Sequence, residues 1–208
     1  VARIGQDVEV RITGDGITEQ TFTVAKYCDF EAKVLESTTT EIMAGREEQR
    51  IGEFFIEELA PGTLVQDRII SVELPEGYEW DNNTPFGNGN YEVVNSSTIT
   101  LGNVRYPDAV AGAKNLGRVM KLEVQADSST AANGAKIKFK KLEVMASPAA
   151  KGDLTLEISG KAGVEGTAKV ATTNPMVSLE ADPVDVVLGV QDQKVADVTL
   201  KESKPDAL

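Results

Sequence analysis

The chain has 208 residues, a formal net charge of −12 at pH 7 and no histidine. Its acidity excludes a surface for nucleic acid, which needs clustered Lys and Arg, and no apolar run approaches the roughly 20 residues of a membrane-spanning helix. Without histidine the commonest general base and metal ligand are missing, so we expect no enzyme, no catalytic residue, no cofactor and no bound metal.

Short runs of alternating apolar and polar residues, bounded by Gly, Pro, Asn and Asp, dominate the chain and predict strands joined by turns. In chain order the predicted strands are 8–12, 69–74, 119–124, 135–144, 154–158 and 164–171. Glycine-containing turns are expected at 14–16 and 160–163, because glycine accepts a positive φ freely. Two stretches, 27–35 and 40–48, are ambiguous between a strand and a helical turn.

The many short strands predict an all-β protein whose body is an antiparallel β-sandwich of the Ig-like kind. Within the run 135–144, Ile137, Phe139, Lys141 and Glu143 are expected to share one face of a single strand. The expected organisation is an N-terminal β-arm at residues 1–44, a β-sandwich at 45–190 and a C-terminal strand at 191–208.

An internal repeat is the most informative feature, because residues 49–64 align without gaps to residues 193–208. The matching pairs are Gln49 and Gln193, Glu58 and Glu202, Pro61 and Pro205, Leu64 and Leu208, and upstream Gly45 and Gly189, and Glu48 and Asp192. We therefore expect a domain to open at about residue 49, and the opening strand of a second copy to begin at about residue 193.

The copied C-terminal strand is expected to have no domain of its own to pair with, so its unpaired backbone groups would need a partner. It would lie on its own sandwich, insert into a neighbour or continue into a longer protein. In the second case Val195, Val198 and Leu200 are the expected assembly residues, with main-chain hydrogen bonds adding affinity. The N-terminal arm at residues 8–24 is the alternative donor of the exchanged strand.

Several segments resemble a family of secreted surface proteins of anaerobic Gram-positive bacteria, built from tandem β-rich modules. The resembling segments are VRITGDG at 10–16, the repeat opening at 49–64, VELPEGYEW at 72–80, KIKF at 136–139, ISGKAGV at 158–164 and LGVQDQ at 188–193. Members often carry a copper amine oxidase N-terminal-like domain elsewhere in the chain. The resemblance covers most of this sequence and implies an extracellular, modular protein. It implies no copper site here, because there is no histidine to bind the metal.

Three aromatic residues, Tyr78, Trp80 and Phe86, are candidates for a platform on which sugar rings would stack. The alternative interpretation, which we favour, places Trp80 in the core of the sandwich. Nearby, the triplets that start at Asn82 and Asn95 fit the glycosylation sequon.

Other polar groups carry weaker hypotheses. The oxygen-rich loops 81–84 and 88–90 suit calcium in ligand type but match no standard calcium loop. Glu47, Glu48, Glu53, Glu57 and Glu58 include carboxylate pairs of the kind that glycosidases use, although such residues are usually a solvated face. Cys28 stands alone, which rules out an intrachain disulfide and favours a small buried apolar residue. An intermolecular disulfide or a reactive thiol is the alternative.

These observations favour a structural subunit of an extracellular filament or cell-surface assembly, polymerising head to tail by β-strand exchange with copies of itself. The alternative is a polysaccharide-binding β-sandwich module of a larger cell-surface protein, with cell-wall polysaccharide as partner. A copper-dependent or hydrolytic enzyme is disfavoured by the absence of histidine.

Overall fold

The computed structural model describes residues 6–27, 31–83, 85–87, 89–95 and 98–203, and every regular element in these ranges is a β-strand. The prediction of an all-β fold is therefore confirmed. Within the same ranges, no helix is long and apolar enough to cross a membrane.

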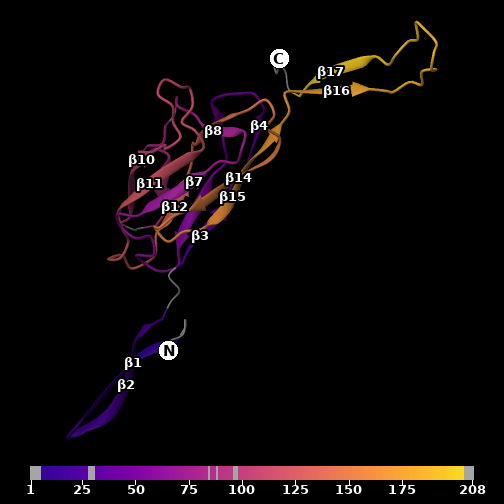
Figure 1. The fold of residues 1–208 in the computed structure, drawn as a ribbon. Coiled ribbons are helices and arrows are strands. Elements are labelled where there is room, and N and C mark those ends of the chain that lie inside the picture. Colours follow the sequence, from indigo (N-terminus) through magenta and orange to yellow (C-terminus); the bar gives the residue numbers. More distant parts are fainter. Residues whose placement is uncertain (1–5, 28–30, 84, 88, 96–97, 204–208) are drawn as a thin grey trace.

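The body of the molecule contains three sheets (Figure 1). The largest has the order β10 (Thr100–Arg105), β11 (Val119–Ala126), β7 (Ile69–Glu73), β14 (Gly152–Ser159), β15 (Gly166–Asn174) and β4 (Thr40–Met43). A four-stranded sheet has the order β3 (Ala32–Glu36), β6 (Phe54–Glu58), β12 (Lys136–Phe139) and β9 (Tyr91–Val93). A three-stranded sheet has the order β5 (Gln49–Arg50), β13 (Glu143–Ala146) and β8 (Tyr78–Trp80).

One apolar core lies between these sheets. Strands such as β6 and β11 bury every second side chain, as expected when one face of a sheet covers a core and the other faces solvent. At the centre, Phe54 and Phe139 stack with ring centroids 4.6 Å apart. The buried residues of all three sheets form a single cluster, so the sheets pack as the layers of a sandwich.

Two details of the body differ from the sequence prediction. The run 135–144 is two strands, because Lys141 adopts a φ of 55° between them and Leu142 and Val144 are buried in its place. The sandwich is also not wholly antiparallel, since β15 pairs with β4 in parallel. The ambiguous stretches 27–35 and 40–48 contain strands β3 and β4.

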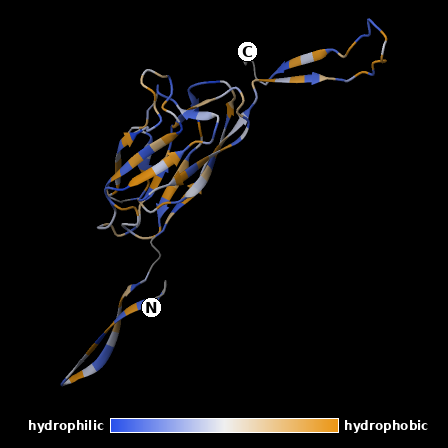
Figure 2. Cartoon of the chain, in the orientation of Figure 1, coloured by the Kyte–Doolittle hydropathy of each residue, from blue (hydrophilic) through white to orange (hydrophobic). Residues whose placement is uncertain are grey.

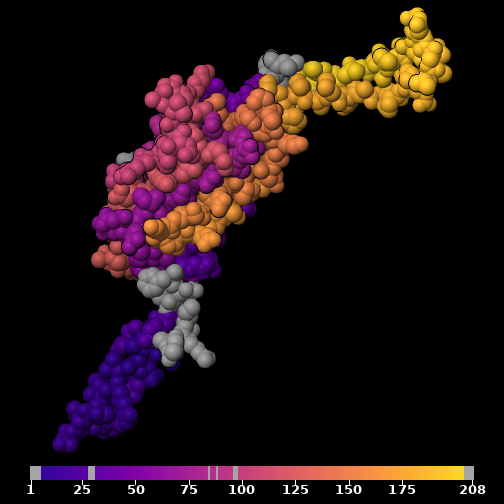
Figure 3. Space-filling view, viewed as in Figure 1, coloured from indigo at the N-terminus to yellow at the C-terminus, as the bar shows by residue number. Residues whose placement is uncertain are grey.

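Two hairpins project from opposite ends of the body (Figures 1 and 3). One consists of β1 (Asp7–Gly14) and β2 (Ile17–Lys26), and the other of β16 (Val177–Ala181) and β17 (Val198–Glu202). Each is a two-stranded sheet of its own. The division of the chain at residues 44 and 190 stays a prediction, but β3 and β4, which precede residue 44, are paired with strands of the body.

Candidate assembly interface

The C-terminal strand has a partner within its own chain. β17 pairs antiparallel with β16, from Val177 opposite Glu202 to Ala181 opposite Val198. The expectation of a strand without a pairing partner is wrong, because residues 177–181, in which no strand was predicted, supply one. Only the outer edges of this two-stranded sheet have no strand beside them among the described residues.

The loop before β17 repeats the loop before β6 in atomic detail. Gln49 donates from Nε2 to the carbonyl oxygens six and three residues earlier, at 2.8 and 3.0 Å, and its Oε1 accepts from the amide six residues earlier. Gln193 makes the same three bonds, with Nε2–O distances of 2.7 and 2.8 Å. The matching positive-φ residues are Gly45 (74°) and Gly189 (82°), and Glu48 (54°) and Asp192 (59°).

The strands that flank this loop correspond as well. In the body, β3 pairs with β6 from Ala32 opposite Glu58 to Glu36 opposite Phe54. The β16–β17 pairing starts at Glu202, the counterpart of Glu58, and ends at Val198, the counterpart of Phe54. The hairpin 177–202 is therefore a second copy of the unit 32–58, which extends the repeat seen in the sequence upstream through β16.

The expected assembly residues lie on this copy and are exposed, whereas their counterparts are buried. The exposed fractions are 68% for Val195, 68% for Val198 and 50% for Leu200, against 2% for Ile51, 0% for Phe54 and 0% for Ile56. Burial of one such side chain contributes about 1.5–3 kcal/mol. The hairpin thus carries an apolar face of the kind that the body covers, alternating along the strand with polar residues (Figure 2).

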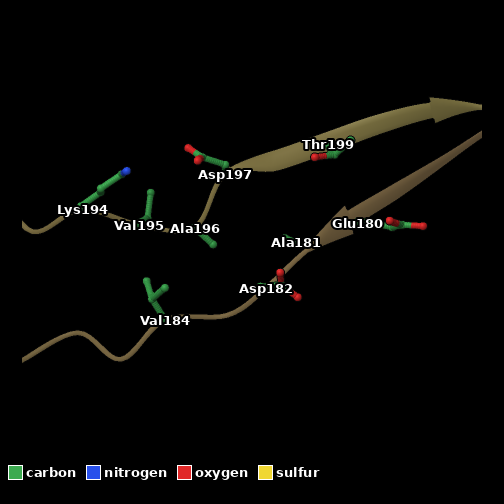
Figure 4. A pocket seen from close by; sticks show the side chains of 9 residues that line it. All are labelled: Glu180, Ala181, Asp182, Val184, Lys194, Val195, Ala196, Asp197 and Thr199. Carbon is green, nitrogen blue, oxygen red and sulfur yellow. The ribbon is translucent and has the colours of Figure 1, made fainter.

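A groove of about 480 Å³ opens where the two arms of this hairpin diverge (Figure 4). One wall is the end of β16 with Asp182 and Val184, and the other runs from Lys194 to Thr199. Apolar Val184, Val195 and Ala196 line it together with charged side chains at its rim. An added strand would pair with the backbone amides and carbonyls of such walls.

The N-terminal hairpin has an exposed apolar face too. Its turn is the predicted one, with Gly14 opposite Ile17 and Gly16 at a φ of 80°. The exposed large apolar residues of this hairpin are Val10 (46%), Ile12 (44%), Ile17 (55%), Phe22 (47%) and Val24 (59%). Both ends of the molecule therefore carry apolar strand faces.

The three candidate sugar-binding aromatics belong to the core. Tyr78, Trp80 and Phe86 are 4%, 3% and 9% exposed. The Tyr78 hydroxyl is 2.7 Å from Thr173 Oγ1, and the Trp80 indole N–H has no acceptor in the described part of the chain. A stacking platform needs an exposed ring face, and none of the three offers one.

Trp80 is accordingly expected to emit blue-shifted fluorescence, because its indole is out of water. Addition of soluble cell-wall glycans should leave the emission unchanged. A red-shifted maximum, or quenching by a glycan that Trp80→Phe removes, would place the ring at a binding surface instead.

The oxygen-rich loop after β8 is occupied by its own hydrogen bonds. Asp81 is buried, and its carboxylate accepts from the amides of Glu48 at 2.9 Å and Asn83 at 2.7 Å. Asn82 is exposed, whereas the Asn95 side chain donates to the Gly134 carbonyl. Residues Thr84, Asn88, Ser96 and Ser97, which complete the calcium and sequon hypotheses, lie outside the described residues, as does Cys28.

The acidic residues of 47–58 are paired or hydrogen-bonded, and Glu47, the one of them that lines a described pocket, forms an ion pair with Lys114. Glu53 pairs with Lys138 at 2.7 Å and Glu57 with Lys136 at 3.1 Å. Among the described residues, no cluster of His, Cys, Asp and Glu is arranged to hold a metal ion.

Three other carboxyl groups, all outside residues 47–58, have a lowered pKa. Hydrogen bonds from Lys140, Ser129 and Lys169 lower the pKa of Glu92, Asp127 and Asp153 respectively. A glycosidase acid needs a raised pKa.

Glu58 is the one buried carboxylate of this group, at 4% exposure. Its Oε1 accepts from the Leu64 amide at 2.7 Å, and its Oε2 accepts from the Ala135 amide at 2.6 Å and from the Ser128 hydroxyl. These bonds tie the end of β6 to two loops, so Glu58 has a structural role.

No known family and no curated protein matches the sequence. Among solved structures, the chain has a distant similarity to a C-terminal fragment of the major pilin GBS80 of Streptococcus agalactiae, at 8% identity and a TM-score of 0.33, over 74% of this chain and 57% of that one. It is also similar to BcpA, the major pilin subunit of Bacillus cereus, at 11% identity and a TM-score of 0.37, over 95% and 61%. The chain spans less than two thirds of either pilin, and values this low establish neither a shared fold nor a shared function. The resemblance to secreted tandem-module proteins stays a prediction.

Proposed function

We propose that the chain is a structural subunit of an extracellular or cell-surface filament, whose copies join head to tail by exchange of β-structure between their terminal hairpins. The carrying observation is the contrast in burial between the C-terminal hairpin and its counterpart in the body. Val198 and Leu200 are exposed, whereas Phe54 and Ile56 are fully buried in the same strand positions. A face of this kind on a single chain favours a partner that covers it.

The placement of the hairpins supports a polymer rather than a closed dimer. They lie at opposite ends of the body, so a contact between the C-terminal hairpin of one copy and the N-terminal hairpin of the next uses two different surfaces (Figure 3). Such a heterologous contact leaves one unused surface at each end of the assembly. Growth then continues unless the rotation between subunits closes a ring.

Electron microscopy of the purified chain at neutral pH, together with sedimentation over a range of concentrations, tests this function. We expect linear assemblies whose length increases with protein concentration. A monodisperse monomer at every concentration would contradict the proposal.

A further inference from the structure

The N-terminal hairpin is the counterpart of the β14–β15 hairpin of the body. Both have the same antiparallel register interrupted by a bulge at the same place. The pairs on either side of the bulge are Val8–Ala25 and Glu9–Thr23 in one hairpin, and Leu154–Ala171 and Thr155–Lys169 in the other. The bulged residue is Val24 in the first and Val170 in the second.

The apolar face of the N-terminal hairpin corresponds to a face that the body buries completely. Exposed fractions are 46% for Val10, 44% for Ile12 and 59% for Val24, against 0% for their counterparts Leu156, Ile158 and Val170. The two projecting hairpins are thus copies of two different units of the body. The N-terminal hairpin is a copy of β14–β15, and the C-terminal hairpin is a copy of β3–β6.

Those two units contact each other within the body. β15 passes between the diverging arms of the β3–β6 unit, where the Gly52 amide donates to the Val170 carbonyl at 2.8 Å. On the other arm, Ala171 pairs in parallel with Thr40. The body therefore shows how a β14–β15 unit contacts a β3–β6 unit.

The groove of the C-terminal hairpin corresponds to the space between the arms of the β3–β6 unit, which β15 occupies in the body. Its wall residues Ala196 and Val184 are the counterparts of Gly52 and Thr40. In the body, Val170 and Ala171 lie between these positions, and their counterparts are Val24 and Ala25 of the N-terminal hairpin.

We infer that the groove of the C-terminal hairpin binds strand β2 of a second copy of this chain, with Val24 and Ala25 entering between its arms. The inference rests on the proposed head-to-tail assembly and specifies its joint. The Ala196 amide of one copy donates to the Val24 carbonyl of the next, and residues 184–186 add in parallel to Ala25, Lys26 and Tyr27.

The residues that this register brings together are complementary. In the body, Thr172 pairs with Glu41. The counterpart of Thr172 is Lys26 and that of Glu41 is Asp185, so opposite charges meet across the joint. The next pair, counterpart of Thr173 and Ile42, brings Tyr27 against Val186. These two apolar side chains are 45% and 57% exposed in the single chain.

The joint is a close copy of the contact in the body rather than an identical one. A Cβ at Gly52 would lie 1.8 Å from the Thr38 carbonyl oxygen and 2.7 Å from that of Val170, and the second copy has Ala196 there. The first conflict is relieved because the connection after β16 is shorter than that after β3, from Ala181 to Val184 instead of Glu36 to Thr40. The second requires β2 to shift slightly outward.

Disulfide trapping between full-length chains tests the register. Ala25→Cys and Val184→Cys are made in separate chains, each with Cys28→Ser to remove the native thiol. Adjacent strands bring opposed Cα atoms to about 4.8 Å, within the range of a disulfide. Mixing the two chains under mild oxidation should give a mixed dimer at a yield at least about tenfold above that of Ala25→Cys mixed with Ser178→Cys, whose thiol lies on the exposed side of β16.

The outcomes separate the two proposals. Preferential trapping at Ala25 and Val184 supports the joint. If the unsubstituted chain forms filaments but the trapped yield equals that of the Ser178 control, the register is overturned while the filament function stands. If no assembly forms and no dimer is trapped, both proposals fall.

Discussion

Replacement of Leu200 by Asp is expected to abolish assembly while leaving the body folded. Leu200 is half exposed in the single chain, and its counterpart Ile56 is fully buried, so we expect the proposed assembly to cover this side chain. The substitution removes about 1.5–3 kcal/mol of apolar burial and adds the cost of desolvating a carboxylate. Since 1.4 kcal/mol corresponds to a tenfold change in affinity, we expect the joint to weaken at least about 100-fold, measured by sedimentation.

Ser178→Asp is the matched control, because it adds the same charge to the same hairpin at an exposed position on β16. It should assemble like the unsubstituted chain. Circular dichroism and thermal unfolding should show an unchanged body for both variants. If Leu200→Asp assembles normally, this face of the C-terminal hairpin is not part of the joint.

Glu58→Ala is expected to have the largest effect on folding. The substitution removes an acceptor from two buried main-chain amides, those of Leu64 and Ala135, and from the Ser128 hydroxyl. Each buried donor left without a partner costs about 1–3 kcal/mol, so for three donors the free energy of unfolding should fall by at least about 3 kcal/mol in urea titration.

The neighbouring Glu57→Ala provides the comparison. Glu57 pairs with Lys136 across β6 and β12, but the side chains of Glu57 and Lys136 are 38% and 34% exposed to solvent. A pair of this kind contributes about 0–1 kcal/mol, so its loss should be small. Equal losses for the two variants would show that Glu58 is not the anchor of these loops.

Much of the body could be predicted from the sequence, because strands buried on one face alternate with a period of two. The segments 69–74, 119–124 and 154–158 match β7, β11 and β14 on this ground. The break in 135–144 could not be predicted, since Lys141 keeps the alternation while its positive φ moves Leu142 into the core. Only tertiary packing reveals which of the two faces is buried there.

The candidate interface, too, could be predicted from the sequence only in part. Matching types at Gln49 and Gln193 revealed the repeat, because a side chain that bonds three main-chain groups must be kept for the loop to form. β3 and β16 have different residues at all five equivalent positions, so their equivalence appears only in the strand register. The likeness of the N-terminal hairpin to β14–β15 is also written in the sequence, because residues 8–27 align without gaps to residues 154–173. This second repeat was missed in the sequence, and the shared bulge in the strand register reveals it.

The most direct test of head-to-tail joining mixes two full-length variants that are each disabled at one end. Val24→Asp disables the N-terminal hairpin and keeps the C-terminal groove, whereas Leu200→Asp does the reverse. We expect each variant alone to sediment as a monomer, and an equimolar mixture to form a 1:1 dimer that does not grow, because only one joint can form. A mixture that stays monomeric, or filaments formed by either variant alone, would contradict assembly through these two hairpins.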